Sequence, residues 1–101
     1  MMYVDMVVRL SRNAAKQLRK VPLHIRKSLN FWILSVQEEG IEAIRRIPGY
    51  HDEPLVGEKT GRRSIRLNRQ WRAEYIETEA DDGKGVLIDI ILIMEVHPHD
   101  Y

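Results

Sequence analysis

The run from Val86 to Val96 constrains the fold of this chain most strongly. It is almost continuously Val, Ile and Leu, and Asp89 and Glu95 are the charged residues that interrupt it. Consecutive apolar positions of this kind are typical of a central strand that is buried on both faces. The run is too short and too charged to span a bilayer. The sequence therefore predicts a sheet protein with this strand near the middle of the sheet.

Strand-like and helical periodicities alternate before this run. Residues 3–9 alternate loosely and predict a first strand, after which Ser11 is a suitable N-cap for a short helix. A second helix is predicted from an apolar stripe at spacings of four, three and four, formed by Ile25, Leu29, Trp32 and Val36. Gly40 marks the end of this helix, and one or two more helical turns are expected before Pro48. Residues 49–61 lack periodicity and predict a loop with room for one short extended piece.

Two further strands are predicted between this loop and the apolar run. Ser64–Leu67 and Trp71–Thr78 alternate in the manner of strands, and residues 68–70 are a turn candidate between them. Asp81–Gly85 is the strongest turn signal in the chain. At 101 residues the chain is expected to be a single domain over residues 1–101. The order strand, helix, helix, strand, strand, strand predicts an α+β fold: a small, mainly antiparallel sheet with two helices packed on one face. The first strand is expected to pair beside the later ones, which brings both chain ends into one sheet.

Charge is distributed unevenly although the net charge is only +1. Residues 9–27 hold seven basic and no acidic side chains, residues 45–72 hold eight basic and three acidic, and residues 73–101 hold one basic and eight acidic. Segregation of this kind concentrates the field on one face and predicts an anionic partner. For residues 9–27 alone, an ordinary solvated helix face is the preferred interpretation. Cysteine is absent, which excludes disulfides and thiolate metal sites and fits a reducing compartment. The protein is therefore expected to be cytoplasmic, and neither membrane association nor a cofactor is expected.

Basic side chains cluster on and beside the hairpin predicted around residues 68–70. Arg66 and Arg72 fall on its two strands close to the turn, so strands in register bring both within reach of one phosphate. A guanidinium binds phosphate oxygens in bidentate fashion and stabilises charge that develops there. The other possibility is pairing with acidic residues across the sheet, at ~0–1 kcal/mol for each pair. The residues expected to hold an RNA backbone are Lys59, Arg62, Arg63 and Arg69. Trp71 and Tyr75 could stack on bases, but a place in the core is preferred for both.

The residues after the apolar run carry groups suited to proton transfer. His97, His99 and Tyr101 share one face if the last strand continues, with Asp100 opposite, although Pro98 favours an edge or an exit from the sheet. Cleavage of RNA by its own 2′-hydroxyl needs a base and an acid, and histidine titrates near neutrality. A metal half-site completed by Asp100 or His51 is the competing interpretation. No further His or Cys set is spaced to complete it, so no metal is expected. A frayed end without a role is the third possibility.

Three stretches of the chain resemble the RelE/ParE superfamily of bacterial toxins, and the HigB-type branch looks nearest. They are residues 47–57, residues 61–72 and the triplet His99-Asp100-Tyr101. The resemblance implies a RelE-like fold of the microbial ribonuclease type. It also implies the toxin of a type II toxin–antitoxin module, which cleaves mRNA in the ribosomal A site without metal.

The resemblance also assigns individual residues. It matches Arg66 and Arg72 to the hairpin arginines, and His99 and Tyr101 to the catalytic motif. Residues of the basic loop and a histidine before the leucine–glycine turn are matched by Lys59, Arg62, Arg63 and His51. Val56 departs from the pattern, because many relatives carry lysine between that leucine and glycine.

The partners implied by the resemblance are an antitoxin, the ribosome with its mRNA, and operator DNA bound through the antitoxin complex. The antitoxin is expected to be a helix-turn-helix protein encoded by an adjacent gene. Two other functions stay open: a ParE-like toxin that inhibits DNA gyrase without catalysis, and a non-catalytic nucleic-acid-binding module.

Overall fold

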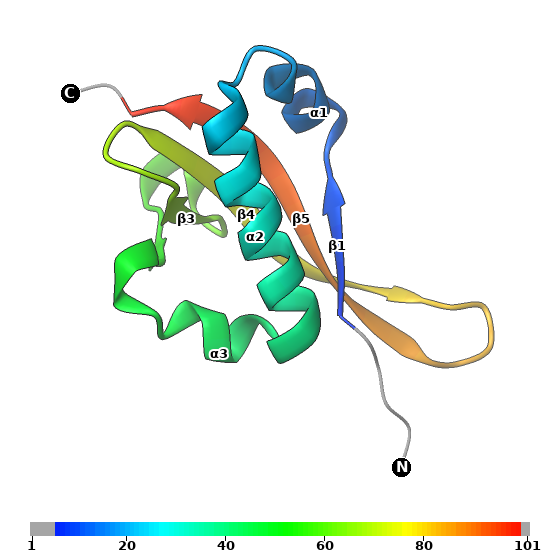
Figure 1. The fold of residues 1–101 in the computed structure, drawn as a ribbon. Helices are drawn as coiled ribbons and strands as arrows, with labels where there is room; N and C mark the ends of the chain where they lie inside the picture. The colour runs from blue at the N-terminus through cyan, green and yellow to red at the C-terminus, as the bar shows by residue number, and fades with distance from the viewer. Residues whose placement is uncertain (1–5, 100–101) are drawn as a thin grey trace.

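A five-stranded sheet with three α-helices packed against it forms the structure, a computed structural model that describes residues 6–99 (Figure 1). The strands lie in the order β1-β5-β4-β3-β2, in which β1 runs parallel to β5 and the other pairs are antiparallel. The strands are β1 (Val7–Leu10), β2 (Glu53–Pro54), β3 (Arg63–Arg66), β4 (Trp71–Asp81) and β5 (Leu87–Pro98). The predicted α+β class and mainly antiparallel sheet are therefore confirmed, as is the pairing of the first strand beside the last. The short β2 is the extended piece expected in the loop.

The helices follow the predicted periodicities. They are α1 (Arg12–Leu18), α2 (Leu23–Glu39) and the short α3 (Ile41–Arg45), followed by the 3-10 turns η1 (Pro48–Tyr50) and η2 (Gly57–Lys59). Ser11 caps α1 as expected, because its Oγ accepts the backbone N–H of Ala14 at 3.0 Å. Gly40 ends α2 with a φ of +85°, a conformation that glycine adopts without steric cost. No helix within residues 6–99 has the length and apolar character needed to cross a membrane.

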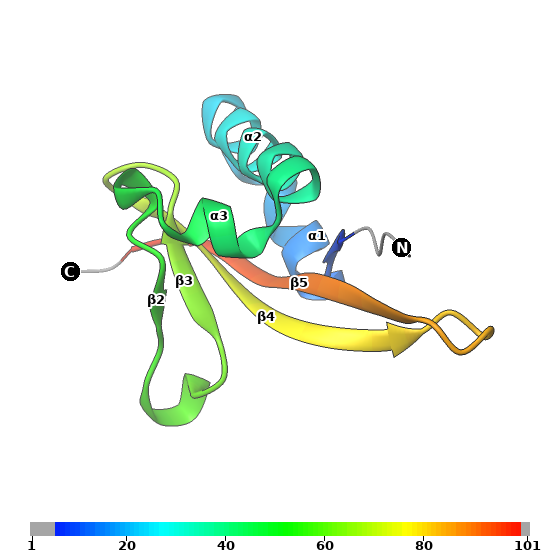
Figure 2. The same ribbon diagram turned by 90° about the horizontal axis from the view of Figure 1, so that it is seen from below.

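The core lies between the helices and one face of the sheet. All four residues of the predicted α2 stripe are buried there, and the ring of Trp32 packs 5.3 Å from that of Tyr75. Figure 2 shows α2 and α3 on one side of β3, β4 and β5, while the opposite side is not covered by a helix. The two faces of the sheet therefore have different environments: one packs against the α-helices, and the other, called the open face below, carries no α-helix of residues 6–99.

The prediction that the apolar run is buried on both faces is wrong. In β5 the fully buried side chains are Ile91, Ile93 and Val96, whereas Leu87 is 55% exposed. The physical reason is that the helices cover one face only. The β4–β5 hairpin also extends past them as a long arm (Figure 2). β5 is central in pairing, since β1 and β4 flank it, but it is not central in burial.

Helix α1 protects the edge of β5 beyond the end of β1. The pairing with β1 stops at Ile93; after it, Ser11 Oγ donates to the carbonyl oxygen of Met94 at 2.9 Å. The backbone N–H of Val96 donates to the side-chain oxygen of Gln17 at 2.6 Å. On the other edge, pairing with β4 continues through Pro98, and the N–H of the next residue donates to the carbonyl oxygen of Gln70. The proline nitrogen faces away from β4, so Pro98 removes no bond from that ladder and His97 stays in register.

Candidate functional site

Three side chains form a row across the open face of the sheet. Arg66 on β3 is paired with Arg72 on β4, and Arg72 is paired with His97 on β5. Their sequence neighbours Ile65 and Ala73 face the core, so the row faces the other side. Cross-strand neighbours have Cβ atoms about 4.5–5.5 Å apart, close enough for adjacent side chains to contact one phosphate group. The strands of Arg66 and Arg72 therefore have the register that was needed to bring both side chains within reach of one phosphate.

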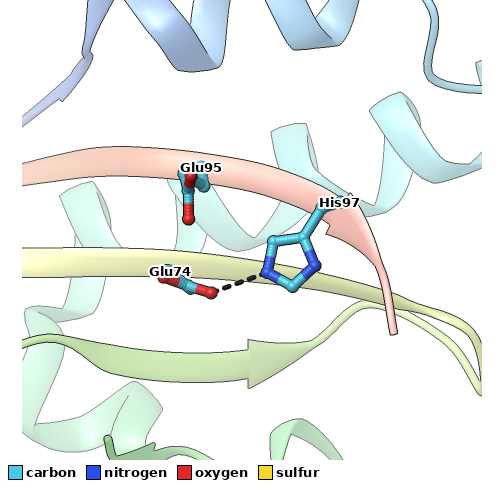
Figure 3. A group of neighbouring side chains, drawn as sticks. All are labelled: Glu74, Glu95 and His97. Atoms are coloured by element: carbon cyan, nitrogen blue, oxygen red, sulfur yellow. Dashed lines mark hydrogen bonds and ion pairs between the residues drawn. The ribbon is translucent and has the colours of Figure 1, made fainter. Parts of the chain in front are cut away.

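A second row beside the first is acidic. Glu74 is paired with Glu95, both on the open face, and Glu74 is only 3% exposed. Figure 3 shows the two carboxylates and the imidazole of His97 converging from β4 and β5. The Nε2 atom of His97 lies 2.6 Å from Oε2 of Glu74.

Two basic residues neutralise these carboxylates. Lys59 Nζ lies 2.8 Å from Glu74 Oε2 and 3.0 Å from Glu95 Oε2. Arg62 NH1 lies 3.1 Å from the other oxygen of Glu74 and 3.2 Å from Glu95. Burial by itself raises the pKa of Glu74, but hydrogen bonds from Lys59, His97 and Arg62 outweigh it and lower the pKa to about 2. Glu74 is therefore ionised at any physiological pH, and the hydrogen bond to Glu74 in turn raises the pKa of Lys59.

This acidic row offers ligand atoms for a metal ion but is already filled by cations. The ligand atoms of Glu74, Glu95 and His97 lie within 4.8 Å of one another, and they are the only such group among residues 6–99. The ammonium of Lys59 bridges the two carboxylates, and Arg62 bridges them again. A divalent ion would have to displace both, so the donor set suits ion pairing better than metal binding. His51, considered as a ligand from the sequence, does not belong to this group.

The two arginines of the row differ from the other basic residues in their partners. Within residues 6–99, no carboxylate pairs with Arg66 or Arg72, so the salt bridges considered from the sequence do not form there. Arg72 NH1 donates to the carbonyl oxygens of Asn68 at 2.8 Å and Trp71 at 3.1 Å, which fixes it against the β3–β4 turn. The Nε of Arg66 is buried and has no hydrogen-bond partner in the described part of the chain. An unsatisfied buried donor costs ~1–3 kcal/mol.

Arg63 lies on the opposite face from its predicted companions. Its Nε contacts Asp52 Oδ1 at 2.6 Å, and the side chain of Asp52 is 1% exposed. The hydroxyl of Tyr75 donates to the other oxygen of Asp52 at 2.5 Å, and Arg45 joins this cluster by donating from NH2 to that hydroxyl at 3.3 Å. Burial and the bond to Asp52 raise the pKa of Tyr75 to about 12. The structure thus separates Arg63 from Lys59, Arg62 and the arginine row.

The remaining predicted residues lie near the β3–β4 turn or outside the described structure. Arg69 is exposed in that turn, and His99 is exposed just after β5, beside Gln70. Asp100 and Tyr101 lie outside residues 6–99. Tyr75 is fully buried and Trp71 packs partly buried against the core, so the preference for a core position holds for both.

Two important acidic residues were missed in the sequence. Glu74 was considered only as a surface partner for arginine, although its spacing of two from Arg72 places both on one face of β4. That spacing was the sequence signal from which the position of Glu74 beside Arg72 could have been predicted. Asp52 lies in a loop without periodicity, so no sequence pattern marked it as buried.

The fold can be compared with known proteins. No protein-family model matches the chain, and no curated protein matches it. Among solved structures, the RelBE2 toxin–antitoxin complex from Mycobacterium tuberculosis is similar with 22% identity and a TM-score of 0.61, covering 95% of this chain and 100% of that one. A YoeB/ParE toxin from Agrobacterium tumefaciens has 16% identity and a TM-score of 0.61, with coverages of 94% and 100%. YafQ from E. coli has 13% identity and a TM-score of 0.67, with 91% of each chain covered. The chain therefore has the fold of RelE/ParE-type toxins.

Proposed function

We propose that this protein is the toxin of a type II toxin–antitoxin module and a ribosome-dependent endoribonuclease that cleaves mRNA without metal. The observation that carries this proposal is the row Arg66, Arg72 and His97 on an open sheet face, in which neither arginine has a carboxylate partner among residues 6–99. The likeness of the fold to solved toxins supports the biological role. Guanidinium groups beside a proton-transfer group suit transfer of a phosphoryl group.

In the proposed reaction, the 2′-oxygen of a ribose attacks the adjacent phosphorus while the bond to the 5′-oxygen breaks. Arg66 and Arg72 bind the phosphate and stabilise the charge that grows on its oxygens. One group takes the proton of the 2′-hydroxyl and another gives a proton to the leaving 5′-oxygen, and His99 serves in one of these roles with Tyr101 assisting. The products are a 2′,3′-cyclic phosphate and a free 5′-hydroxyl.

The basic residues around the row have different parts in this proposal. Arg69 in the β3–β4 turn is suited to hold the RNA backbone next to the site. Lys59 and Arg62 can contact RNA only if phosphate competes with Glu74 and Glu95 for them. Arg63 braces the β2–β3 region through Asp52 and supports the site from behind.

Cleavage on programmed ribosomes tests the proposal. Wild-type protein should cut the mRNA in the A site equally well whether or not the protein alone was first treated with EDTA and the chelator then removed. Arg66→Ala and His99→Ala should each lower the rate by about 100-fold or more, as expected when phosphate stabilisation or acid–base catalysis is lost. His24→Gln, which changes an exposed histidine of α2, is the matched control. Intact mRNA with the wild-type protein overturns the ribonuclease assignment. Growth arrest that survives Arg66→Ala would favour the gyrase alternative.

The proposed antitoxin has a suitable surface on the outer side of α2. Leu23, Phe31 and Leu34 are 58%, 66% and 52% exposed and fall on one stripe opposite the core. Lys27 lies within this stripe and Arg26 beside it, in a segment without acidic residues. An amphipathic antitoxin segment with acidic flanks would match both the apolar anchors and the charge. Two of the solved structures with this fold are toxin–antitoxin complexes, RelBE2 and DinJ-YafQ.

Binding of the protein encoded by the adjacent gene tests this surface. Phe31→Ser combined with Leu34→Ser should weaken the measured affinity by about 100-fold or more, since interface aromatic anchors often cost over 2 kcal/mol on truncation. Gln37→Ser, an exposed change on the same helix, is the control. Unchanged affinity in the double variant places the antitoxin elsewhere.

A further inference from the structure

We infer that His97 is the general acid of the cleavage and that buried Glu74 is the residue that positions it. This inference rests on the proposed ribonuclease function. The resemblance points to His99 for catalysis, whereas the sequence pattern offers both His97 and His99, and neither gives Glu74 a catalytic role. The geometry of the open face instead favours His97 as the acid and His99 as the base.

His97 is fixed in the row by its strand, whereas His99 follows the strand end. The register of β4 with β5 puts His97 directly beside Arg72, which is itself beside Arg66. A phosphate bound by the two arginines therefore lies next to the imidazole of His97. A proton donor has to stand within hydrogen-bond reach of the leaving oxygen of that phosphate.

Both ring nitrogens of His97 face acceptor oxygens. Nε2 lies 2.6 Å from the carboxylate of Glu74, and Nδ1 lies 3.0 Å from the carbonyl oxygen of Pro98. Each contact is a hydrogen bond only when that nitrogen carries a proton. The contact to Glu74 is partly buried, whereas the contact to Pro98 is exposed, so Nδ1 is the nitrogen that solvent and substrate can reach.

Glu74 resembles the buried carboxylate of a serine protease triad in its role. Such a carboxylate holds one ring nitrogen and fixes the orientation of the imidazole, while the other nitrogen transfers the proton. Glu74 is held in turn by Lys59 and Arg62, which leave its carboxylate little freedom to rotate. It does not contact the substrate in this arrangement and acts through His97.

The charges around Glu74 also stay balanced when His97 gives its proton to the leaving group. The two carboxylates of Glu74 and Glu95 are balanced by the two cations of Lys59 and Arg62 before His97 is counted. When His97 gives up its Nδ1 proton, Glu74 therefore keeps two charged partners. A buried carboxylate that lost its only partner would instead be strongly destabilised.

In the assigned step, the 2′-oxygen forms its bond to phosphorus and the bond between phosphorus and the 5′-oxygen breaks. The electron pair of the broken bond stays on the 5′-oxygen, which takes the Nδ1 proton of His97 in place of the Pro98 carbonyl contact. The proton of the 2′-hydroxyl passes to His99 as the base. Water then takes the extra proton from His99 and returns a proton to Nδ1 of His97, which restores both groups for the next cleavage.

An mRNA with sulfur in place of the leaving 5′-oxygen tests the assignment, because a thiolate leaves without being protonated. The modified linkage is put at the position that wild-type protein cuts on programmed ribosomes. His97→Gln should cut the natural linkage at least about 100-fold more slowly than wild type. It should cut the sulfur linkage within a few-fold of wild type. Glu74→Gln should show a smaller loss, about 10-fold or more, with the same recovery, which a merely structural role would not produce.

The controls separate the possible failures. His24→Gln and Glu79→Gln change exposed side chains and should behave as wild type on both substrates. Folding of each variant is checked by its thermal melting curve, and Glu74→Asp replaces Glu74→Gln if the latter does not fold. A His97→Gln variant that is equally slow on both linkages, or as fast as wild type on the natural one, overturns this inference. Wild-type protein that cuts neither linkage overturns the proposed function itself.

Discussion

Neutralising Glu74 should remove a large part of the acid sensitivity of this protein. The pKa of Glu74 falls from an ordinary 4.5 to about 2 in the folded state. Because one pKa unit corresponds to 1.36 kcal/mol, the ionised carboxylate contributes about 3 kcal/mol to the free energy of unfolding. Glu74 is 3% exposed, so solvent screens this contribution little. The perturbation is Glu74→Gln, which keeps the shape of the side chain and removes its charge.

The direction of the effect follows from the lowered pKa. A carboxylate that is more acidic in the folded state stabilises the fold fully above its unfolded pKa of 4.5. That stabilisation is lost as the pH falls toward and through about 2. The wild-type protein should therefore be the more stable form at pH 7 by about 3 kcal/mol. The difference between wild type and Glu74→Gln should shrink to below about 1 kcal/mol near pH 2.

Urea unfolding at a series of pH values measures this difference. The fluorescence of buried Trp32 reports the transition, and the slope with urea checks that the same surface is exposed on unfolding. Glu79→Gln, an exposed change on the same strand, should follow the wild-type curve within about 0.5 kcal/mol at every pH. A gap between wild type and Glu74→Gln that stays constant from pH 7 to pH 2.5 would refute the reasoning, because it would mean that Glu74 has the same pKa in both states.

Three further predictions follow from single contacts. Tyr75→Phe should lower the unfolding free energy by about 1–3 kcal/mol, because buried Asp52 loses a hydrogen-bond donor; urea unfolding measures this, and an unchanged midpoint contradicts it. Ser11→Ala should cost about 1–2 kcal/mol in the same assay, since it removes the cap of α1 and the bond to Met94. Arg66→Ala should slow mRNA cleavage by about 100-fold or more without lowering stability, because the buried Nε of Arg66 has no hydrogen-bond partner within residues 6–99; a large fall in stability would show a structural role.

The sequence predicted the helices and strands well where a single period ran over several residues. Four apolar residues of α2 recur at helical spacing, and all four are buried. Such a repeat puts them on one face of the helix, whichever elements pack against that face. The Ser11 cap and the alternation of Ser64–Arg66 are equally local. Burial of the apolar run was predicted wrongly because burial depends on what packs against a strand. A continuous apolar run is equally compatible with one covered face and an exposed arm.

The candidate site was predicted in part for the same reason. Alternation placed Arg66 and Arg72 on their strands, but only the pairing of β3 with β4 and of β4 with β5 made them neighbours of each other and of His97. The sequence grouped Arg63 with Lys59 and Arg62 by proximity along the chain. Strand geometry separates them, because adjacent residues of a strand point to opposite faces.

The sequence by itself determined the periods, the caps, the turns and the segregation of charge, since each is set by residues within a few positions of one another. Only the tertiary structure decided which charges meet. Glu74 lies 15 residues from Lys59 and 23 from His97, and the pairing of strands brings the three together on one face. Burial then gives those contacts their strength, because charges shielded from water interact more strongly than the same charges on an open surface.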